Sequence, residues 1–342
     1  MKDFSRYSRQ LILKEIGREG QRRLEESRVA VIGIGALGSV SSNLLARAGV
    51  GNVVLVDRDY LEIDNLQRQV LFDENDLVGD LPKAVAAKAR LEKINSEIKI
   101  EAIVGDLSAD TAGEFLGAVD IVIDGTDNFE TRFLINDYCL THKIPWIYGG
   151  ALRTEGMSYV ILPGEGPCLR CLFGEAPSPA DIQTCEQVGI LSPVAHVIAS
   201  FQAIEAIKIL AGHKEAVERN LWKMDLWSRE FKSITVDHLR NMPCSGCLGE
   251  EFPYLQTSAG TRTVALCGRN AVQVLTPAGR KIDLQGLAAR LQGQGEIHFN
   301  DYLLRCRTQP YEITVFSNGR AIIKGTEDPV QAKSLYAKYI GA

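Results

Sequence analysis

Residues 28–38 read RVAVIGIGALG. The first part, Arg28 to Gly33, is a short apolar run that predicts a buried strand, and Gly33, Gly35 and Gly38 follow it with the spacing Gly-x-Gly-x-x-Gly. A helix expected to run to Ala48 begins at this turn. Unpaired backbone N–H groups and the helix dipole favour anions there, so the stretch predicts a loop that holds the phosphates of a nucleotide. The loop alone does not separate NAD from ATP, and a tight turn without a ligand is the other interpretation.

The segments after this loop alternate between strand and helix patterns. The expected strands are 52–56, 98–104, 119–123 and 146–148, and the expected helices are 82–95 and 127–143. Alternation at this spacing, with apolar runs such as VDIVI at 119–123, is typical of a parallel sheet covered by helices on both faces. The sequence therefore predicts an α/β fold with a Rossmann-like, mostly parallel, doubly wound sheet.

The flanking segments have different patterns. Residues 5–26 predict a charge-rich amphipathic helix, and residues 157–162 and 221–236 predict antiparallel strands that continue the sheet. A mostly apolar helix is expected at about 193–212, and GEAPSPADIQTCEQVG at 174–189 predicts a long mobile loop.

Three parts are expected along the chain. Residues 1–248 hold every chemical motif, residues 249–256 look like a linker, and residues 257–342 predict a small C-terminal α+β domain whose role the sequence does not indicate. The length of 342 residues is sufficient for such an arrangement.

Composition excludes several classes of partner. The net charge of −5 argues against a nucleic-acid-binding protein, which needs a basic face to displace counterions. No continuous apolar run reaches the roughly 18 residues of a membrane span, and the polar start MKDFSRYSRQ does not resemble a secretory signal. Eight cysteines in such a chain indicate metal or thiol chemistry in a reducing compartment, and we expect a cytoplasmic protein.

Polar residues beyond the second expected strand favour ATP over NAD. Asp57 ends that strand, where a carboxylate can accept hydrogen bonds from ribose hydroxyls. The amide Asn65 and the cations Arg68 and Lys83 follow. Cations in such a position stabilise a triphosphate while its α-phosphorus is attacked. A solvated charged turn is the alternative for these residues.

Asp127 follows another expected strand, in the run DGTDN at 124–128. A carboxylate at this edge of the sheet can hold Mg²⁺ while phosphates complete the coordination shell. The alternative is that Asp127 only caps the next helix.

Two Cys-x-x-Cys pairs, Cys168/Cys171 and Cys244/Cys247, match the spacing of a closed, structural Cys₄ zinc site. Cys185 stands apart, in the predicted loop. A loop thiol can act as a nucleophile or carry sulfur, and it can equally be a bystander.

Together these motifs resemble the MoeB/ThiF family, which is related to the ubiquitin-activating enzymes. The resemblance covers about residues 4–248 and rests on these stretches: RYSRQ (6–10), GIGALG (33–38), VDRDYLEIDNLQRQ (56–69), PK (82–83), DGTDN (124–128), PCLRC (167–171), TCEQVG (184–189) and CSGC (244–247). The closing part, with LCGRN at 266–270 and NGRAIIKGTEDP at 318–329, is most similar to the Bacillus-type ThiF branch.

The resemblance implies a nucleotidyltransferase that uses ATP, Mg²⁺ and Zn²⁺. It adenylates the C-terminal Gly-Gly carboxylate of a ubiquitin-like, ThiS-like sulfur carrier, for thiocarboxylate formation in thiamine thiazole biosynthesis. It implies the following residues: catalytic, Arg9, Arg68, Lys83, Asp127 and Cys185; nucleotide-binding, Gly33, Gly35, Ala36, Gly38, Asp57, Asp59, Asp64, Asn65, Arg68, Lys83, Asp127 and Asn128; zinc, Cys168, Cys171, Cys244 and Cys247; magnesium, Asp127.

The resemblance also implies partners. Arg9 matches an arginine that family dimers insert into the neighbouring subunit's ATP site, so a homodimer is expected. Cys185 matches a cysteine that can bond to the carrier through sulfur, and a sulfur donor such as a cysteine desulfurase is expected. A MoaD-like carrier of molybdopterin biosynthesis, an NAD(P)-dependent oxidoreductase and a non-catalytic scaffold remain as alternatives.

Overall fold

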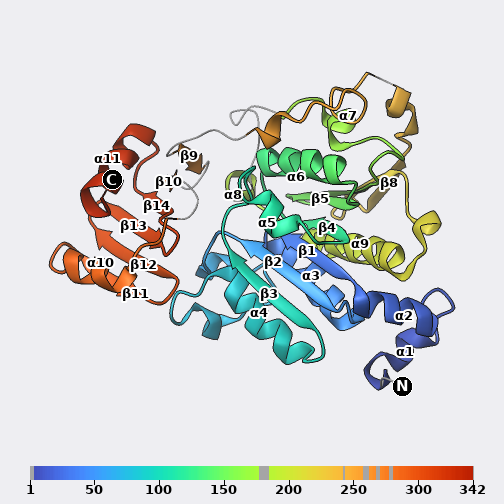
Figure 1. The fold of residues 1–342 in the computed structure, drawn as a ribbon, viewed down its shortest axis with the longest axis horizontal. Helices are drawn as coiled ribbons and strands as arrows, with labels where there is room; N and C mark the ends of the chain where they lie inside the picture. Colours follow the sequence, from blue (N-terminus) through green and yellow to red (C-terminus); the bar gives the residue numbers. More distant parts are fainter. Residues whose placement is uncertain are drawn as a thin grey trace. The chain divides into compact units, whose positions relative to one another are not determined.

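A computed structural model of the chain describes residues 4–176, 185–241, 243–256, 262–266, 270–276 and 280–341. These residues form two compact units (Figure 1). The first consists mainly of residues before 257 and the second mainly of those after it.

The first unit is built on an eight-stranded sheet in the order β3-β2-β1-β4-β5-β6-β7-β8. The first five strands of this order, β3, β2, β1, β4 and β5, are parallel, and β6, β7 and β8 continue the sheet in antiparallel pairing. The predicted mostly parallel sheet with an antiparallel continuation is thereby confirmed. The strands are β1 (Arg28–Ile32), β2 (Asn52–Asp57), β3 (Lys99–Val104), β4 (Ile121–Asp124), β5 (Trp146–Leu152), β6 (Glu155–Ile161), β7 (Leu221–Asp225) and β8 (Glu230–Ile234).

Helices cover both faces of the parallel part of the sheet. The chain moves from β1 outward to β2 and β3, and then returns past β1 to β4 and β5. Because parallel crossovers are right-handed, this reversal places α3 (Ala36–Ala48) and α4 (Lys83–Ile94) on one face, and α5 (Ala112–Leu116) and α6 (Phe129–His142) on the other. β1 and β4 are almost wholly buried between these layers, which accounts for their unbroken apolar sequences.

The long helix α9 (Ser192–Ala211) packs against α3 (Figure 1). Its length and hydropathy alone would allow it to cross a membrane. Ten of its residues are buried inside the first unit, and some of them share an apolar cluster with Leu37 and Val40 of α3. Its apolar composition is therefore that of a core helix.

The N-terminal segment differs from the single helix expected at residues 5–26. It forms a 3₁₀ turn η1 (Ser5–Tyr7), a short helix α1 (Ser8–Leu11) and a separate helix α2 (Gly17–Glu26). Gly17 has φ +54°, a left-handed value that interrupts a right-handed helix, so α2 can only begin there.

Short elements complete the first unit: α7 (Leu169–Phe173) and the 3₁₀ turns η2 (Ile63–Asn65), η3 (Glu74–Leu77), η4 (Lys214–Ala216), η5 (Asp237–Asn241) and η6 (Pro253–Leu255). The short helix α8 (Cys185–Val188) is divided along the chain, since its residues up to Gln187 group with the second unit and Val188 with the first. Of the loop predicted at 174–189, residues 177–184 lie outside the described residues. The stretch 249–256 carries η6, where the ring of Tyr254 stacks on that of Phe133 with centroids 5.3 Å apart.

The second unit has a six-stranded antiparallel sheet in the order β11-β12-β13-β14-β10-β9. Leu287 of α10 and Tyr336 of α11 pack against residues of one face of that sheet. The small α+β architecture expected after residue 257 is confirmed. Its elements are β9 (Arg262–Leu266), β10 (Ala271–Leu275), α10 (Leu284–Leu291), β11 (Glu296–Phe299), β12 (Leu303–Thr308), β13 (Tyr311–Phe316), β14 (Ala321–Lys324) and α11 (Pro329–Tyr339).

Candidate nucleotide site and cysteine cluster

The predicted nucleotide residues gather where the strand order reverses. β1 has β2 on one side and β4 on the other, and the connections after these two neighbours run in opposite directions. Open α/β sheets bind ligands outside the carboxyl ends of strands at such a switch point. The glycine loop, Asp57 and the DGTDN loop all follow the carboxyl ends of these three strands.

The glycine loop and the DGTDN loop are in direct contact. Gly33 has φ +84°, and a Cβ there would lie 2.6 Å from the carbonyl oxygen of Gly125. A Cβ on Gly38 would lie 1.8 Å from the carbonyl oxygen of Gly33. Only glycine is compatible with these distances, so close packing of two loops and a helix explains Gly33 and Gly38. Within the described part of the chain, a Cβ on Gly35 would meet only Gln69 Nε2, at 3.9 Å.

Asp57 supports the glycine loop as well as facing the site. Its Oδ2 accepts a hydrogen bond from the N–H of Ile34 at 2.6 Å, and its Oδ1 accepts one from the N–H of Asp59 at 2.7 Å. Burial raises the pKa of the Asp57 carboxyl, while the nearby Lys83 ammonium and the two N–H groups act in the opposite direction. Each carboxylate oxygen can accept a further bond, so binding of a ribose hydroxyl remains compatible with these contacts.

Lys83 is brought to Asp59 by main-chain pairing. The Lys83 N–H donates to the carbonyl of Asp59 at 2.8 Å, and Tyr60 and Pro82 form an antiparallel bridge. The Lys83 Nζ then lies 3.7 Å from Asp59 Oδ2, on a side chain that is only 7% exposed. The first helical residue of α4 thus places a buried cation next to the end of β2.

Arg58 is a cation at this edge that the sequence analysis did not select. Its Nη1 lies 3.1 Å from Asp106 Oδ1. Burial alone lowers the pKa of Arg58, but nearby carboxylates, Asp127 among them, raise it above the ordinary value. Asp127 therefore acts electrostatically on the same edge of the sheet as Arg58 and Lys83. The only feature of the sequence that could have pointed to Arg58 is its position directly after Asp57.

Asp64 and Asn65 belong to η2, and Arg68 lies in the turn that follows it. Asn65 is buried; its Nδ2 donates to Asp64 Oδ1 at 2.9 Å, and Arg68 Nη1 donates to the Asp64 carbonyl at 2.8 Å. Gln69 comes next and was also not selected. It is 2% exposed, its Oε1 has no hydrogen-bond partner among the residues that the structure describes, and its Nε2 would lie 3.9 Å from a Cβ on Gly35. Gln69 thus connects this turn to the glycine loop.

Asp127 does not cap α6. Asn128 does so, because its Oδ1 accepts the N–H of Thr131 at 2.8 Å. The alternative that Asp127 only caps the helix is therefore wrong, and the Asp127 side chain is exposed at the mouth of the site. Ala36, the first residue of α3, is half-buried beside the same loop.

Arg9 lies far from these residues in its own chain. It is exposed on α1, and the adjacent Gln10 donates from Nε2 to the carbonyl of Ala48 at 3.0 Å. Ala48 is the last residue of α3, whereas the glycine loop precedes the first. The 13 residues of α3 separate the two by about 20 Å.

The four paired cysteines converge as their spacing predicted. Their sulfur atoms all lie within 4.8 Å of one another, with Cys168–Cys244 at 3.7 Å and Cys171–Cys247 at 3.5 Å. Four sulfurs about 2.3 Å from one zinc ion would stand roughly 3.8 Å apart, so this donor set fits tetrahedral zinc. The contact with Cys171 lowers the pKa of Cys168 to about 5, while burial raises that of Cys247 to about 12. Metal binding requires deprotonated thiols, so a bound cation would favour the thiolate form of these side chains.

A buried ion pair supports the cysteine cluster. Arg170, inside the first Cys-x-x-Cys pair, has Nη2 3.2 Å from Asp137 Oδ1, and Nη1 donates to Ser245 Oγ at 3.3 Å. Asp137 Oδ2 also accepts the N–H of Tyr254 at 3.2 Å. The pair thus links α6, both cysteine segments and η6. Sequence spacing contained no signal for it, because Asp137 and Arg170 lie in different elements.

Cys185 is the first residue of α8, and its side chain lies outside the described residues. The structure therefore adds nothing to the prediction of a nucleophilic or sulfur-carrying role at this position.

Comparisons with known proteins agree on one family. The model of the ThiF family matches residues 7–246. The chain is 41% identical to the "Sulfur carrier protein ThiS adenylyltransferase" of Bacillus subtilis (strain 168), covering 98% of this chain and 99% of that protein. It is 38% identical to the "Sulfur carrier protein adenylyltransferase" of Thermus thermophilus, covering 73% and 92% respectively. Among solved structures, E. coli MccB with MccA-N7isoASN has a TM-score of 0.61 and 25% identity, covering 69% of this chain and 73% of that one.

Proposed function

The chain belongs to the ThiF family, and from that membership we propose that it is an ATP-dependent adenylyltransferase acting on the C-terminal Gly-Gly carboxylate of a ubiquitin-like, ThiS-type sulfur carrier. The observation that carries the proposal is the meeting of a glycine phosphate loop, a buried Lys83 and an exposed Asp127 at one switch point of the sheet. An NAD site has no need for a buried cation of this kind around the second strand.

The chemistry follows from these groups. A carboxylate oxygen of the carrier attacks the α-phosphorus of ATP, the bond to the bridging oxygen breaks, and pyrophosphate leaves with its electron pair. The glycine loop binds phosphate oxygens through N–H groups and Asp57 binds the ribose. Lys83, Arg68 and Asn65 hold the triphosphate while negative charge moves onto the departing pyrophosphate. The product is an acyl-adenylate. A sulfur nucleophile at the sulfide level that attacks its acyl carbon displaces AMP, which leaves with the electron pair of the broken C–O bond, and gives a thiocarboxylate.

Two metals accompany this proposal. Asp127 would hold Mg²⁺, which neutralises phosphate charge when bound; its exposed carboxylate beside the glycine loop fits a metal that prefers one or two carboxylates and phosphate oxygens. The four cysteines would hold structural Zn²⁺, for which their sulfur separations are suitable. We assign the whole reaction to residues 1–248 and no role to residues 257–342.

The remaining partners are proposals of the same kind. Since α3 separates Arg9 from the glycine loop of its own chain, an Arg9 that serves catalysis must reach the site of a second copy, which makes the enzyme a homodimer. Cys185 would hold the carrier through sulfur after adenylation, with a cysteine desulfurase as donor. We place the enzyme in the cytoplasm.

Carrier-dependent ATP–pyrophosphate exchange tests the proposal. Exchange should require a carrier ending in Gly-Gly and should fail with the same carrier lacking its last residue. Comparison of ThiS-like and MoaD-like carriers decides between the two pathways. Absence of exchange with both carriers, together with a fluorescence change on titration with NADH, would favour the oxidoreductase instead.

A further inference from the structure

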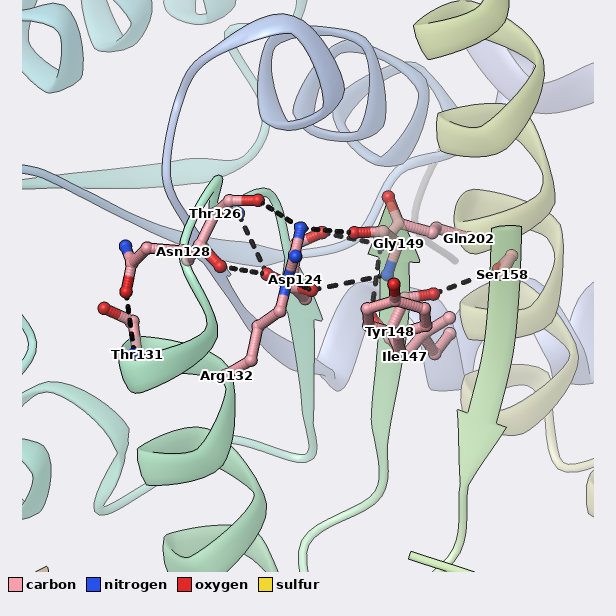
Figure 2. Close-up of polar contacts among 10 residues, drawn as sticks. All are labelled: Asp124, Thr126, Asn128, Thr131, Arg132, Ile147, Tyr148, Gly149, Ser158 and Gln202. Atoms are coloured by element: carbon pink, nitrogen blue, oxygen red, sulfur yellow. Dashed lines mark hydrogen bonds and ion pairs between the residues drawn. The ribbon is translucent and has the colours of Figure 1, made fainter. Parts of the chain in front are cut away.

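A buried polar network underlies the loop that carries Asp127 (Figure 2). Asp124, at the end of β4, is fully buried, and its Oδ2 lies 3.0 Å from Arg132 Nε. Arg132 comes from the second turn of α6, and its side chain is 8% exposed. Burial alone lowers the pKa of Arg132, but the Asp124 carboxylate raises it above the ordinary value.

The network holds the residue before Asp127 through every polar group it has. Asp124 Oδ1 accepts the Thr126 N–H at 2.9 Å and the Thr126 hydroxyl at 2.6 Å. Arg132 Nη2 donates to the Thr126 carbonyl at 2.6 Å. The residue after Asp127, Asn128, is held as the cap of α6. The backbone of Asp127 is therefore fixed from both sides, although its side chain is exposed.

The same groups connect this loop to the rest of the site. Arg132 Nη2 also donates to the Gly149 carbonyl on β5 at 3.0 Å. Gln202 of α9, fully buried, donates from Nε2 to the main-chain carbonyl of Asp124 at 2.7 Å and to that of Ile147 at 3.1 Å. Its Oε1 accepts the Ser41 hydroxyl of α3 at 3.2 Å. The loop is thus held by α6, α9, β4 and β5 (Figure 2), and Ser41 joins α3 to the same network.

Lysine could not replace Arg132 in this position. The guanidinium uses Nε for the carboxylate and Nη2 for two carbonyls, while its Cζ lies over the ring of Tyr148, 5.2 Å from the centroid, and over that of Phe129 at 5.3 Å. A single ammonium cannot reproduce this fork or its stacking. Burying the Asp124–Arg132 ion pair is energetically costly, and its effect here is to fix the backbone that carries the exposed carboxylate of Asp127.

We propose that Arg132, anchored by Asp124, is the positioning residue that holds the 125–127 loop so that Asp127 meets the triphosphate in the geometry of adenyl transfer. This inference rests on the proposed function. Arg132 itself touches no substrate and acts only through Thr126. Its removal should therefore lower kcat and leave the KM for the carrier unchanged.

The test compares Arg132→Lys with a matched Arg28→Lys. Arg28 forms a half-buried pair with Glu101 at 2.7 Å at the opposite end of β1. We expect Arg132→Lys to lower kcat for carrier-dependent exchange by roughly 10- to 100-fold, as outer-shell partners of functional groups do, while Arg28→Lys stays near wild type. Hydrogen–deuterium exchange of the full chain, without ligands, should accelerate at residues 125–131 in Arg132→Lys only.

Each outcome decides the matter. The positioning role would be overturned by a kcat of Arg132→Lys equal to that of Arg28→Lys, or by hydrogen–deuterium exchange at residues 125–131 like that of the wild type. The proposed function would then still stand on the activity of the wild type. A loss of melting temperature with kcat retained would show a purely structural residue. Should Arg132→Lys not fold, Thr126→Val, which deletes one bond to Asp124, must show the same changes in smaller measure. If the wild type itself lacks activity, the proposed function fails, and the deuterium exchange alone decides whether Arg132 orders the loop.

Discussion

Arg9 allows a quantitative test of the proposed dimer. Gln10 contacts Ala48 at the end of α3 that is distant from the glycine loop, about 20 Å along the helix. An Arg9 guanidinium that stabilises phosphates must therefore come from the partner copy. Arg9→Ala and Lys83→Ala should each abolish ATP–pyrophosphate exchange, the first by removing a group supplied in trans and the second by removing one supplied in cis.

The size of the recovery on mixing follows from two-fold symmetry. When equal amounts of the two variants exchange subunits at random, about half of the dimers are hybrids with one intact Lys83 facing one intact Arg9. One of the two sites in each hybrid is complete. Activity should therefore return to roughly 25% of the wild-type value per subunit.

The matched control places both substitutions in one chain. An Arg9→Ala, Lys83→Ala double variant mixed with an equal amount of wild type gives hybrids in which neither site is complete. If Arg9 acts in trans, only wild-type dimers remain active, and activity should be roughly 25% of the wild-type value per subunit. If Arg9 acts in its own chain, every wild-type subunit remains active, and activity should be roughly 50%. Native mass spectrometry measures the hybrid fraction, and carrier-dependent exchange measures the activity.

Two results would refute this reasoning. One is a mixture of the single variants that stays inactive although hybrids have formed. The other is a control mixture that retains half of the activity. Either result would mean that Arg9 does not serve the neighbouring site.

Four other outcomes are expected. Asp127→Ala should lower exchange more than tenfold, about 1.4 kcal/mol or more, and weaken ATP binding less, since metal and phosphate contacts act on developing charge; exchange kept within that limit contradicts its role. Metal analysis should find one zinc per chain, and a Cys168→Ser, Cys244→Ser double variant should melt at lower temperature; unchanged melting argues against a structural metal. With carrier and ATP, Cys185→Ala should keep exchange but lose any thiol-sensitive adduct in which the Cys185 thiolate has displaced AMP from the acyl-adenylate, as read on non-reducing gels; an adduct that survives the substitution makes this thiol a bystander. Asp137→Ala should lower the free energy of unfolding by about 3–5 kcal/mol, because it leaves the buried Arg170 without its carboxylate partner, and calorimetry should show a large loss of melting temperature. A loss below about 1 kcal/mol would show that the pair is dispensable.

Some features of the site are local and could be predicted from the chain. A strand, a glycine turn and a helix are contiguous, so RVAVIGIGALG indicates both the fold class and the phosphate loop. The break in the N-terminal helical segment could not be predicted, because the amphipathic pattern continues across Gly17 and only the positive φ of this residue reveals the break. Cysteine spacing predicted a four-sulfur cluster, since thiolates three residues apart are a familiar metal-binding unit.

Other features depend on contacts between distant elements. Asp124, Arg132 and Gln202 come from a strand and two helices, and each alone is an ordinary polar residue. Their burial in one network follows from the sheet order, which brings α6 and α9 to opposite faces of β4 and β5. Gln69 was overlooked for the same reason, since only the folded chain places its amide beside Gly35.

The division has a physical cause. Backbone conformation and ligand chemistry depend on neighbours in sequence, so glycine loops, strand patterns and cysteine pairs are legible in the amino-acid order. Which side chain satisfies a buried main-chain carbonyl depends instead on packing among segments that can be 78 residues apart, as Gln202 and Asp124 are. Tertiary structure alone therefore decided that Arg132 lies under the Asp127 loop, and that Arg9 lies at the end of α3 opposite to the site.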